Sequence, residues 1–170
     1  MSNSAITTTE SIDLPYEIEH MRAAYRLLPL YGAQDPQLRN LIIESFWVHA
    51  RNLIEMFLEK SNSVNPRRMA ASGYAPLDGA KLQTFYSSIC KQITHLKAGR
   101  PVTGKLNCRD PEFINLIEAE IAHFIAQVRP DVHAYLGPDK IGEPMIPDHV
   151  PLGPSGQTGT VSGWTGPRGP

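Results

Sequence analysis

The side chains best suited to chemistry gather on one helical segment and at the end of the next. His49, Arg51 and Asn52 lie within one turn of the segment 36–60, and His95 lies near the end of the segment 80–98. An imidazole can act as a general base, and a guanidinium can stabilise the charge that develops on a phosphate during RNA cleavage. His49, Arg51, Asn52 and His95 are therefore the candidate catalytic residues.

A helical projection of segment 36–60 leaves two interpretations of these residues open. At about 100° per residue, His49 falls inside the apolar arc centred on Phe46, and Asn52 falls at the edge of that arc. Arg51 falls on the opposite strip, together with Glu44 and Glu55. In one interpretation, His49 and Asn52 line a cleft between helices. In the other, His49 is a core histidine with one partner, and Arg51 pairs with a glutamate on its own helix.

Motifs for metals and activated nucleophiles are incomplete. The chain contains two Glu-x-x-His pairs, Glu17 with His20 and Glu120 with His123. Di-iron bundles combine two such pairs with glutamates from the other helices, but the segment 80–98 contains no acidic residue. No Gly-x-Ser-x-Gly elbow or phosphate-binding loop occurs. We expect no metal and no cofactor.

Composition excludes several classes of protein. The formal net charge is −1 and 19% of residues are charged, which argues against nucleic-acid binding through bulk positive charge. Cys90 and Cys108 fit no metal motif and are expected to be free thiols in a reducing compartment. The first eleven residues show no secretory signal, and charged residues interrupt the apolar block 41–58. We expect a cytoplasmic protein without a membrane span.

Four helices should position the candidate residues. Three begin with an aspartate followed by a proline in the first turn, at Asp13, Asp35 and Asp110, and Asp78 can cap the remaining one. Apolar residues then recur at spacings of three and four, while no segment alternates long enough for a strand. The pattern predicts an all-α, up-down four-helix bundle, with room for a short fifth helix at 132–136.

The same signals divide the chain into three parts. We expect a disordered N-terminus at 1–12, the bundle domain at 13–130 and a Gly/Pro-rich tail at 131–170 that is largely disordered. From residue 129 onward, 16 of 42 residues are glycine or proline. Within the domain, residues 61–77 have no periodicity and are expected to form a long loop.

The breadth of the apolar arc on segment 36–60 predicts self-association. Ile43, Trp47, Ile54 and Leu58 project to the side of the Phe46 arc, and one small bundle does not readily cover so much apolar surface. We expect a homodimer through this face, unless the loop 61–77 covers it.

Two segments carry a resemblance to a known superfamily. Residues 40–55 and 91–96 resemble small bacterial all-α proteins that are similar to the HEPN superfamily, and the resemblance extends over 14–129. It implies a helical bundle, frequent dimerisation, and association with RNA cleavage or nucleotide handling in defence and toxin–antitoxin systems.

The chain departs from that superfamily at its catalytic motif. Active members place a histidine one to two turns after an arginine and a polar residue. Arg51 and Asn52 match the opening, but Met56, Phe57 and Leu58 stand where the histidine should be. We therefore expect a non-catalytic module that binds RNA, a nucleotide or a cognate partner protein. The alternatives are a rearranged metal-independent ribonuclease, using His49 or His95 with Arg51, and a structural dimerisation protein.

Overall fold

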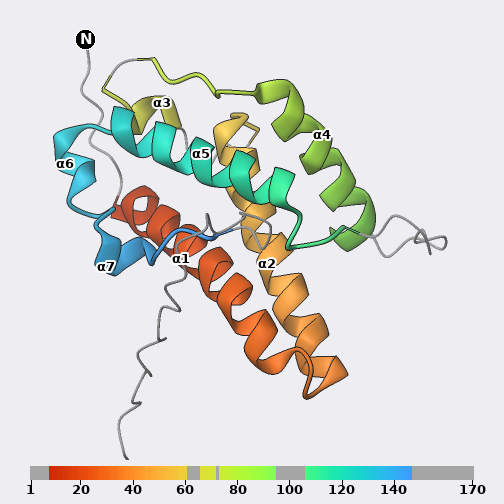
Figure 1. The fold of residues 1–170 in the computed structure, drawn as a ribbon. Helices are drawn as coiled ribbons and strands as arrows, with labels where there is room; N and C mark the ends of the chain where they lie inside the picture. Colours follow the sequence, from red (N-terminus) through yellow and green to blue (C-terminus); the bar gives the residue numbers. More distant parts are fainter. Residues whose placement is uncertain (1–7, 61–65, 72, 95–105, 147–170) are drawn as a thin grey trace, which may run out of the picture.

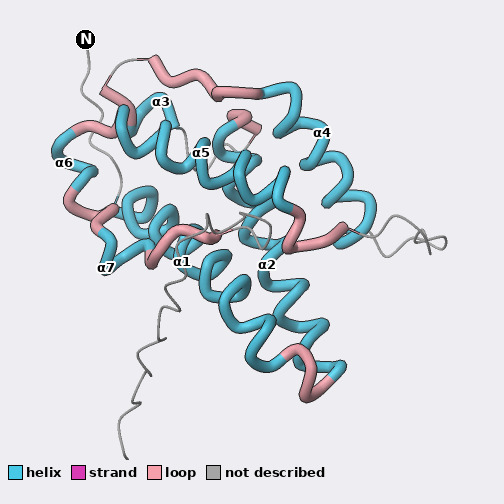
Figure 2. The backbone as a smooth tube through the Cα atoms, viewed as in Figure 1, coloured by secondary structure: helices cyan, strands magenta, loops and turns pink. Residues whose placement is uncertain are grey.

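All regular elements in the described part of the chain are helices. The computed structural model describes residues 8–60, 66–71, 73–94 and 106–146 (Figure 1). Within these ranges there is no strand, and one isolated antiparallel bridge joins Ala70 to Val128 (Figure 2). The predicted all-α class is confirmed.

The first two helices form an antiparallel hairpin. Helix α1 spans Thr8–Tyr31 and α2 spans Pro36–Phe57, and the two run side by side from a tight turn (Figure 1). The Asp35 carboxylate caps α2 by accepting from the backbone N–H groups of Gln37 and Leu38, at 2.7 and 3.3 Å. Proline follows this cap at the first helical position, where its missing N–H costs nothing. The predicted start of α2 is confirmed.

The predicted start of α1 is wrong. Asp13 was expected to cap the helix before Pro15, but α1 already begins at Thr8 and contains both residues. An internal proline removes one backbone hydrogen bond and is unfavourable in an isolated helix. Here Leu14, Ile18 and Met21 are buried on one side of α1, and the helix continues through Pro15 with this side packed in the core. The cap pattern in the sequence is local and contains no information about packing against other helices.

The other two long helices begin where their caps predict. Helix α4 spans Gly79–Ile89, and the Asp78 carboxylate accepts from Lys81 N at 2.9 Å. A π-helical turn, η1, continues it over Cys90–Thr94. Helix α5 spans Pro111–Gln127 and is capped by Asp110, which accepts from Glu112 N at 3.0 Å.

Three short helices occupy segments that lack periodicity. Helix α3, Pro66–Met69, lies in the expected loop, while α6, Pro130–His133, and α7, Pro138–Ile141, lie beyond the expected end of the domain. The structure therefore differs from the predicted boundary at 130. The segment 130–146 packs on the core, with Val132, Leu136, Ile141 and Met145 buried. Residues 147–170 of the predicted tail lie outside the described residues.

A buried ion pair explains why this Gly/Pro-rich segment packs. The Arg22 guanidinium on α1 binds the Glu118 carboxylate on α5 at 2.5 Å and donates to the carbonyls of Ile141 and Gly142. The same carboxylate accepts from Met145 N at 2.8 Å. The Gly/Pro-rich composition of this segment predicts disorder. The segment packs nevertheless, because its backbone groups form hydrogen bonds with a buried ion pair, and such a pair is costly to bury without them.

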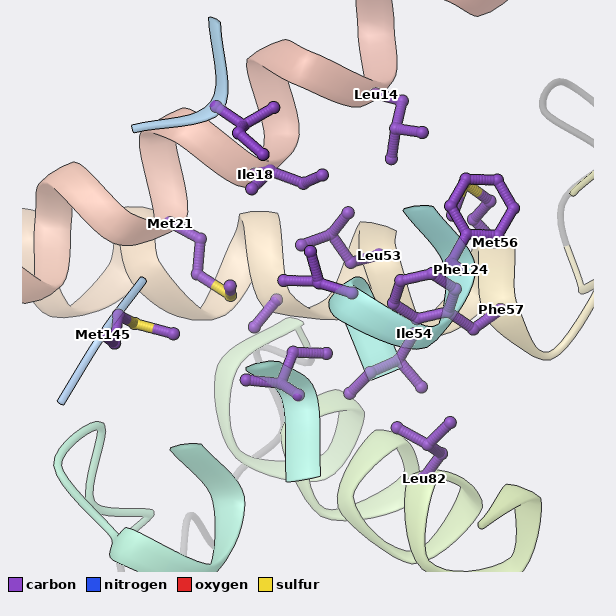
Figure 3. Packing of buried hydrophobic residues seen from close by; sticks show 14 of the residues in the cluster. Leu14, Ile18, Met21, Leu53, Ile54, Met56, Phe57, Leu82, Phe124 and Met145 are labelled. Atoms are coloured by element: carbon purple, nitrogen blue, oxygen red, sulfur yellow. The ribbon is translucent and has the colours of Figure 1, made fainter. Parts of the chain in front are cut away.

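The core lies between the base of the hairpin and α5. Apolar side chains from α1, α2, α4 and α5 meet there, as Figure 3 shows for Leu14, Ile18, Leu53, Ile54, Phe57, Leu82 and Phe124. At the other end of the hairpin, residues 26–41 include no buried side chain. The turn between α1 and α2 thus projects away from α4 and α5 (Figure 1).

Candidate functional site

His49 is held by a carboxylate of the neighbouring helix. Its Nδ1 lies 2.7 Å from Oε2 of Glu17, and its side chain is 12% exposed. The other oxygen of Glu17 accepts from Asn52 Nδ2 at 3.1 Å. One glutamate of α1 therefore joins two of the four candidate residues. This is the second of the two interpretations for His49: a largely buried histidine with a defined partner.

Two aromatic rings of α1 complete the surroundings of His49. The rings of Tyr16 and His20 have centroids 3.8 Å apart, and that of His20 lies 5.3 Å from that of His49. His20 Nδ1 is 3.0 Å from the backbone oxygen of Tyr16, one turn earlier in α1. The cluster formed by Tyr16, Glu17, His20, His49 and Asn52 is called the histidine cluster below.

Arg51 belongs to a separate network on the other side of α2. It binds Glu55 on its own helix at 2.8 Å, and the Tyr86 hydroxyl of α4 donates to the same carboxylate oxygen at 2.7 Å. Cys90 also bonds to both Arg51 and Tyr86. The expected pairing of Arg51 with a glutamate of its own strip is present. These four residues are called the arginine network below.

The arginine network shifts the titration of two members. Its bond to the Glu55 carboxylate, followed by burial, raises the pKa of the Tyr86 hydroxyl to about 12. Burial by itself lowers the pKa of Arg51, but bonds to Cys90 and Tyr86 and the charge of Glu55 outweigh it and raise the pKa. The Tyr86 hydroxyl therefore donates to Glu55 up to a higher pH than an unperturbed tyrosine would, which suits a structural tie between α2 and α4.

The four candidate residues are not brought together. His49 and Asn52 converge on Glu17, whereas Arg51 turns toward α4, and His95 lies outside the described residues. Metal-independent RNA cleavage needs a base and a cation at one phosphate. Among the described residues, the imidazole and the guanidinium proposed for these roles are each engaged with a different carboxylate.

Sequence reasoning missed the partners that decide these roles. Glu17 and His20 were noted as a Glu-x-x-His pair, but their contact with His49 depends on how α1 and α2 align along the hairpin. Tyr86 lies on α4 and Cys90 begins η1, at positions that no motif marks. A helical projection can place residues on one helix; it carries no information about which residue of the next helix lies opposite.

The second Glu-x-x-His pair is structural. Glu120 is fully buried, accepts the Tyr74 hydroxyl, and accepts from Leu77 N at 2.9 Å. Burial, followed by the bond to Glu120, raises the pKa of Tyr74. His123 lies 3.1 Å from the carbonyl of Ala75. Glu120 and His123 thus anchor the segment before α4 to α5. In the described ranges, no group of three or more His, Cys, Asp or Glu side chains is arranged to hold a metal ion.

The face predicted for dimerisation is covered by the chain itself. Trp47 and Ile54 are 1% and 0% exposed, and the Trp47 ring packs on Phe113 of α5 with centroids 5.0 Å apart. The placement of the dimer face at Trp47 and Ile54 is wrong, because the apolar arc of α2 is broad enough to contact α1, α4 and α5 at once. Homodimerisation itself stays a prediction. A dimer through Trp47 and Ile54 would need the core to open.

A different apolar surface is open on the hairpin. Each of its helices carries a second stripe with spacings of three and four, and no member of either stripe is buried. Together they form the outer face of the hairpin, which consists of Tyr16, His20, Ala23, Leu27 and Leu30 on α1 and Leu38, Leu41, Ser45, Val48 and Asn52 on α2. The histidine cluster contributes three residues to it and thus occupies the base end of this surface.

Neither the search for a membrane span nor the comparisons with known proteins identify a further feature of this chain. None of the described helices combines the length and apolar character needed to cross a bilayer. No family model, no curated protein and no solved structure matches the chain.

Proposed function

We propose that this protein is a non-catalytic helical module that binds a protein partner through the outer face of the α1–α2 hairpin. The observation that carries the proposal is the exposure of large apolar side chains there. Tyr16, Leu27, Leu30, Leu41 and Val48 are all at least 40% exposed, and Leu38 is close behind. Contiguous apolar surface of this kind marks interaction sites on folded proteins.

The chemistry of the face favours protein over the other ligands that the HEPN resemblance implies. A phosphate backbone or a nucleotide requires arginine or lysine at the contact, and the outer face contains neither. Apolar side chains at helical spacing instead match the apolar stripe of another helix. We therefore propose that the chain is a HEPN-like up-down bundle and that its function is to bind a protein without catalysing a reaction.

Partner capture with two matched variants tests the proposal. Leu41→Glu places a charge in the outer face, while Leu77→Glu places one at a similarly exposed leucine before α4 (63% and 57% exposed). We expect wild type and Leu77→Glu to retain the same cross-linked protein in cells, and Leu41→Glu to lose it. The captured protein, identified by mass spectrometry, should bind purified wild-type chain. If Leu41→Glu retains every partner of wild type, the outer face is not the binding surface.

An activity assay addresses the ribonuclease alternative. Because His49 and Arg51 are engaged by different carboxylates, we expect the purified protein to cleave RNA no faster than a mock preparation. His49→Ala should lower stability instead, by leaving Glu17 without one of its donors. RNA cleavage that His49→Ala abolishes at an unchanged melting temperature would favour the ribonuclease over the binding module.

A further inference from the structure

The two stripes of the outer face have the spacing of a helix-pairing seam. On α1 the intervals from Tyr16 to Leu30 are four, three, four and three residues, and on α2 those from Leu38 to Asn52 are three, four, three and four. Side chains repeated in this way stay on one side of a helix and interlock with a partner helix that carries the same repeat. The inward stripes of α1 and α2 already use the corresponding pattern inside the core.

Contacts at the base of the hairpin place one member of each outer stripe, His20 and Asn52, next to the other helix. The ring of His20 lies 5.3 Å from that of His49, and Glu17 accepts from Asn52 across the same pair of helices. The two helices are antiparallel and joined by a short turn (Figure 1). Leu27 and Leu30 stand in the last turns of α1 and Leu38 and Leu41 in the first turns of α2, so all four lie toward the same end of the hairpin. The outer face is therefore one two-helix surface, apolar toward the turn and polar toward the histidine cluster.

Charge is scarce on this surface. Between positions 27 and 43 the chain has two charged residues, Asp35 and Arg39, and the Asp35 carboxylate is engaged in capping α2. Interfaces are depleted of charged residues at their centre, and a face without net charge gains nothing from an oppositely charged partner. Such a surface carries no charge that would repel the same surface of a second copy.

We propose that the outer face binds the same face of a second copy of this chain, so that two α1–α2 hairpins associate into a four-helix arrangement. This inference rests on the proposed function, because it names the partner of the same surface. The pairing is isologous, as in most homodimers. Tyr16, His20 and Asn52 then mark one end of the seam with polar groups and fix the alignment of the two copies, while the leucines supply the apolar contact.

The available area is sufficient for such a pair. The six large apolar side chains of the outer face are 38–63% exposed, which leaves on the order of 500 Å² of apolar surface open on one copy. Two copies together would bury on the order of 1,000 Å² from these side chains alone, which reaches the lower limit for a specific interface. Flanking polar residues add to this total.

The molar mass of the purified full chain tests this inference. At concentrations on the order of tens of micromolar, we expect wild type and Leu77→Glu to have the mass of two chains, and Leu41→Glu and Leu30→Glu that of one. All four should melt alike once dilute enough to be monomeric. Wild type with the mass of one chain, or Leu41→Glu and Leu30→Glu with the mass of two, overturns the self-pairing.

Failure of the self-pairing is distinguishable from failure of the proposed function. If wild type is monomeric but captures another protein that Leu41→Glu does not, the outer face binds a different partner and only the self-pairing is wrong. If the captured protein is this chain and the mass measurement agrees, both stand. A monomer whose captures are unchanged by Leu41→Glu rejects both.

Discussion

The base and the turn end of the α1–α2 hairpin contain similar residues and have opposite surroundings. At the base, Ile18 of α1 and Leu53 of α2 are buried beneath α5 and the segment that carries α7. Toward the turn, no side chain of residues 26–41 is buried on any face of the two helices, and the outer-face residues Leu27 and Leu41 are 40% and 63% exposed. Helix formation is equally good at both ends, so what differs is the cover supplied by later parts of the chain. Apolar residues at helical spacing therefore occur on covered and on exposed helix surfaces, and only the fold shows which of them the chain itself covers.

The two ends of the hairpin should differ most in how strongly truncation of a side chain lowers the free energy of unfolding. Phe46→Ala removes a fully enclosed ring that packs on Trp47 and Phe113, and should cost about 3–5 kcal/mol of unfolding free energy. Leu41→Ala in dilute, monomeric protein should cost no more than about 0.5 kcal/mol. Urea unfolding measures both. A loss of several kcal/mol for Leu41→Ala would show that the turn end is covered within one chain.

The cover over the base depends on the Arg22–Glu118 pair, which gives the next largest effect. Arg22→Ala leaves Glu118 largely buried without its cation and should cost about 3–5 kcal/mol. In the same variant, amide hydrogen exchange at 141–146 should be faster than in the wild type. Arg26→Ala is the matched control, because the exposed Arg26 donates one bond to the carbonyl of Glu143. Equal effects of the two variants would mean that the buried pair does not hold the segment.

The two sides of α2 can be separated by double-mutant cycles. Glu17→Ala and His49→Ala should be coupled by about 1 kcal/mol, because the two side chains share a hydrogen bond. Glu17→Ala and Arg51→Ala should be additive to within about 0.5 kcal/mol, since they belong to different networks. Coupling between Glu17 and Arg51 as strong as that between Glu17 and His49 would show that the histidine cluster and the arginine network act as one site.

The smallest effect is the pH dependence of the arginine network. The pKa of Tyr86 is raised to about 12 in the folded protein, above the value of about 10 for an unfolded tyrosine. A raised pKa means that the folded state favours the protonated hydroxyl. The contribution of Tyr86 is then fully present below pH ~10 and is lost as the pH rises toward 12.

Comparison with Tyr86→Phe isolates this contribution. The difference in unfolding free energy between wild type and Tyr86→Phe should shrink between pH 10 and pH 12, and tyrosinate absorbance should show one late-titrating group fewer in the variant. A constant difference across this range would mean that the hydroxyl does not donate to Glu55 in solution.

Local signals in the sequence were sufficient for the helices that have caps. Asp35, Asp78 and Asp110 each engage a backbone N–H within the next three residues, so their effect requires nothing from the rest of the chain. The cap expected at Asp13 failed because packing of Leu14 and Ile18 extends α1 past it. Short helices such as α7 gave no periodic signal, since one turn contains too few residues to repeat.

The amino-acid sequence by itself determined the all-α class, the starts of α2, α4 and α5, and the apolar character of both sides of α2, because these follow from interactions within one or two helical turns. The tertiary structure decided the rest. It paired His49 with Glu17 and Arg51 with Tyr86, covered Trp47, packed four side chains of the segment 130–146 on the core, and left Leu27 and Leu41 exposed. Each of these outcomes depends on which residues of separate helices lie opposite one another, and helix alignment is set by packing over the whole core.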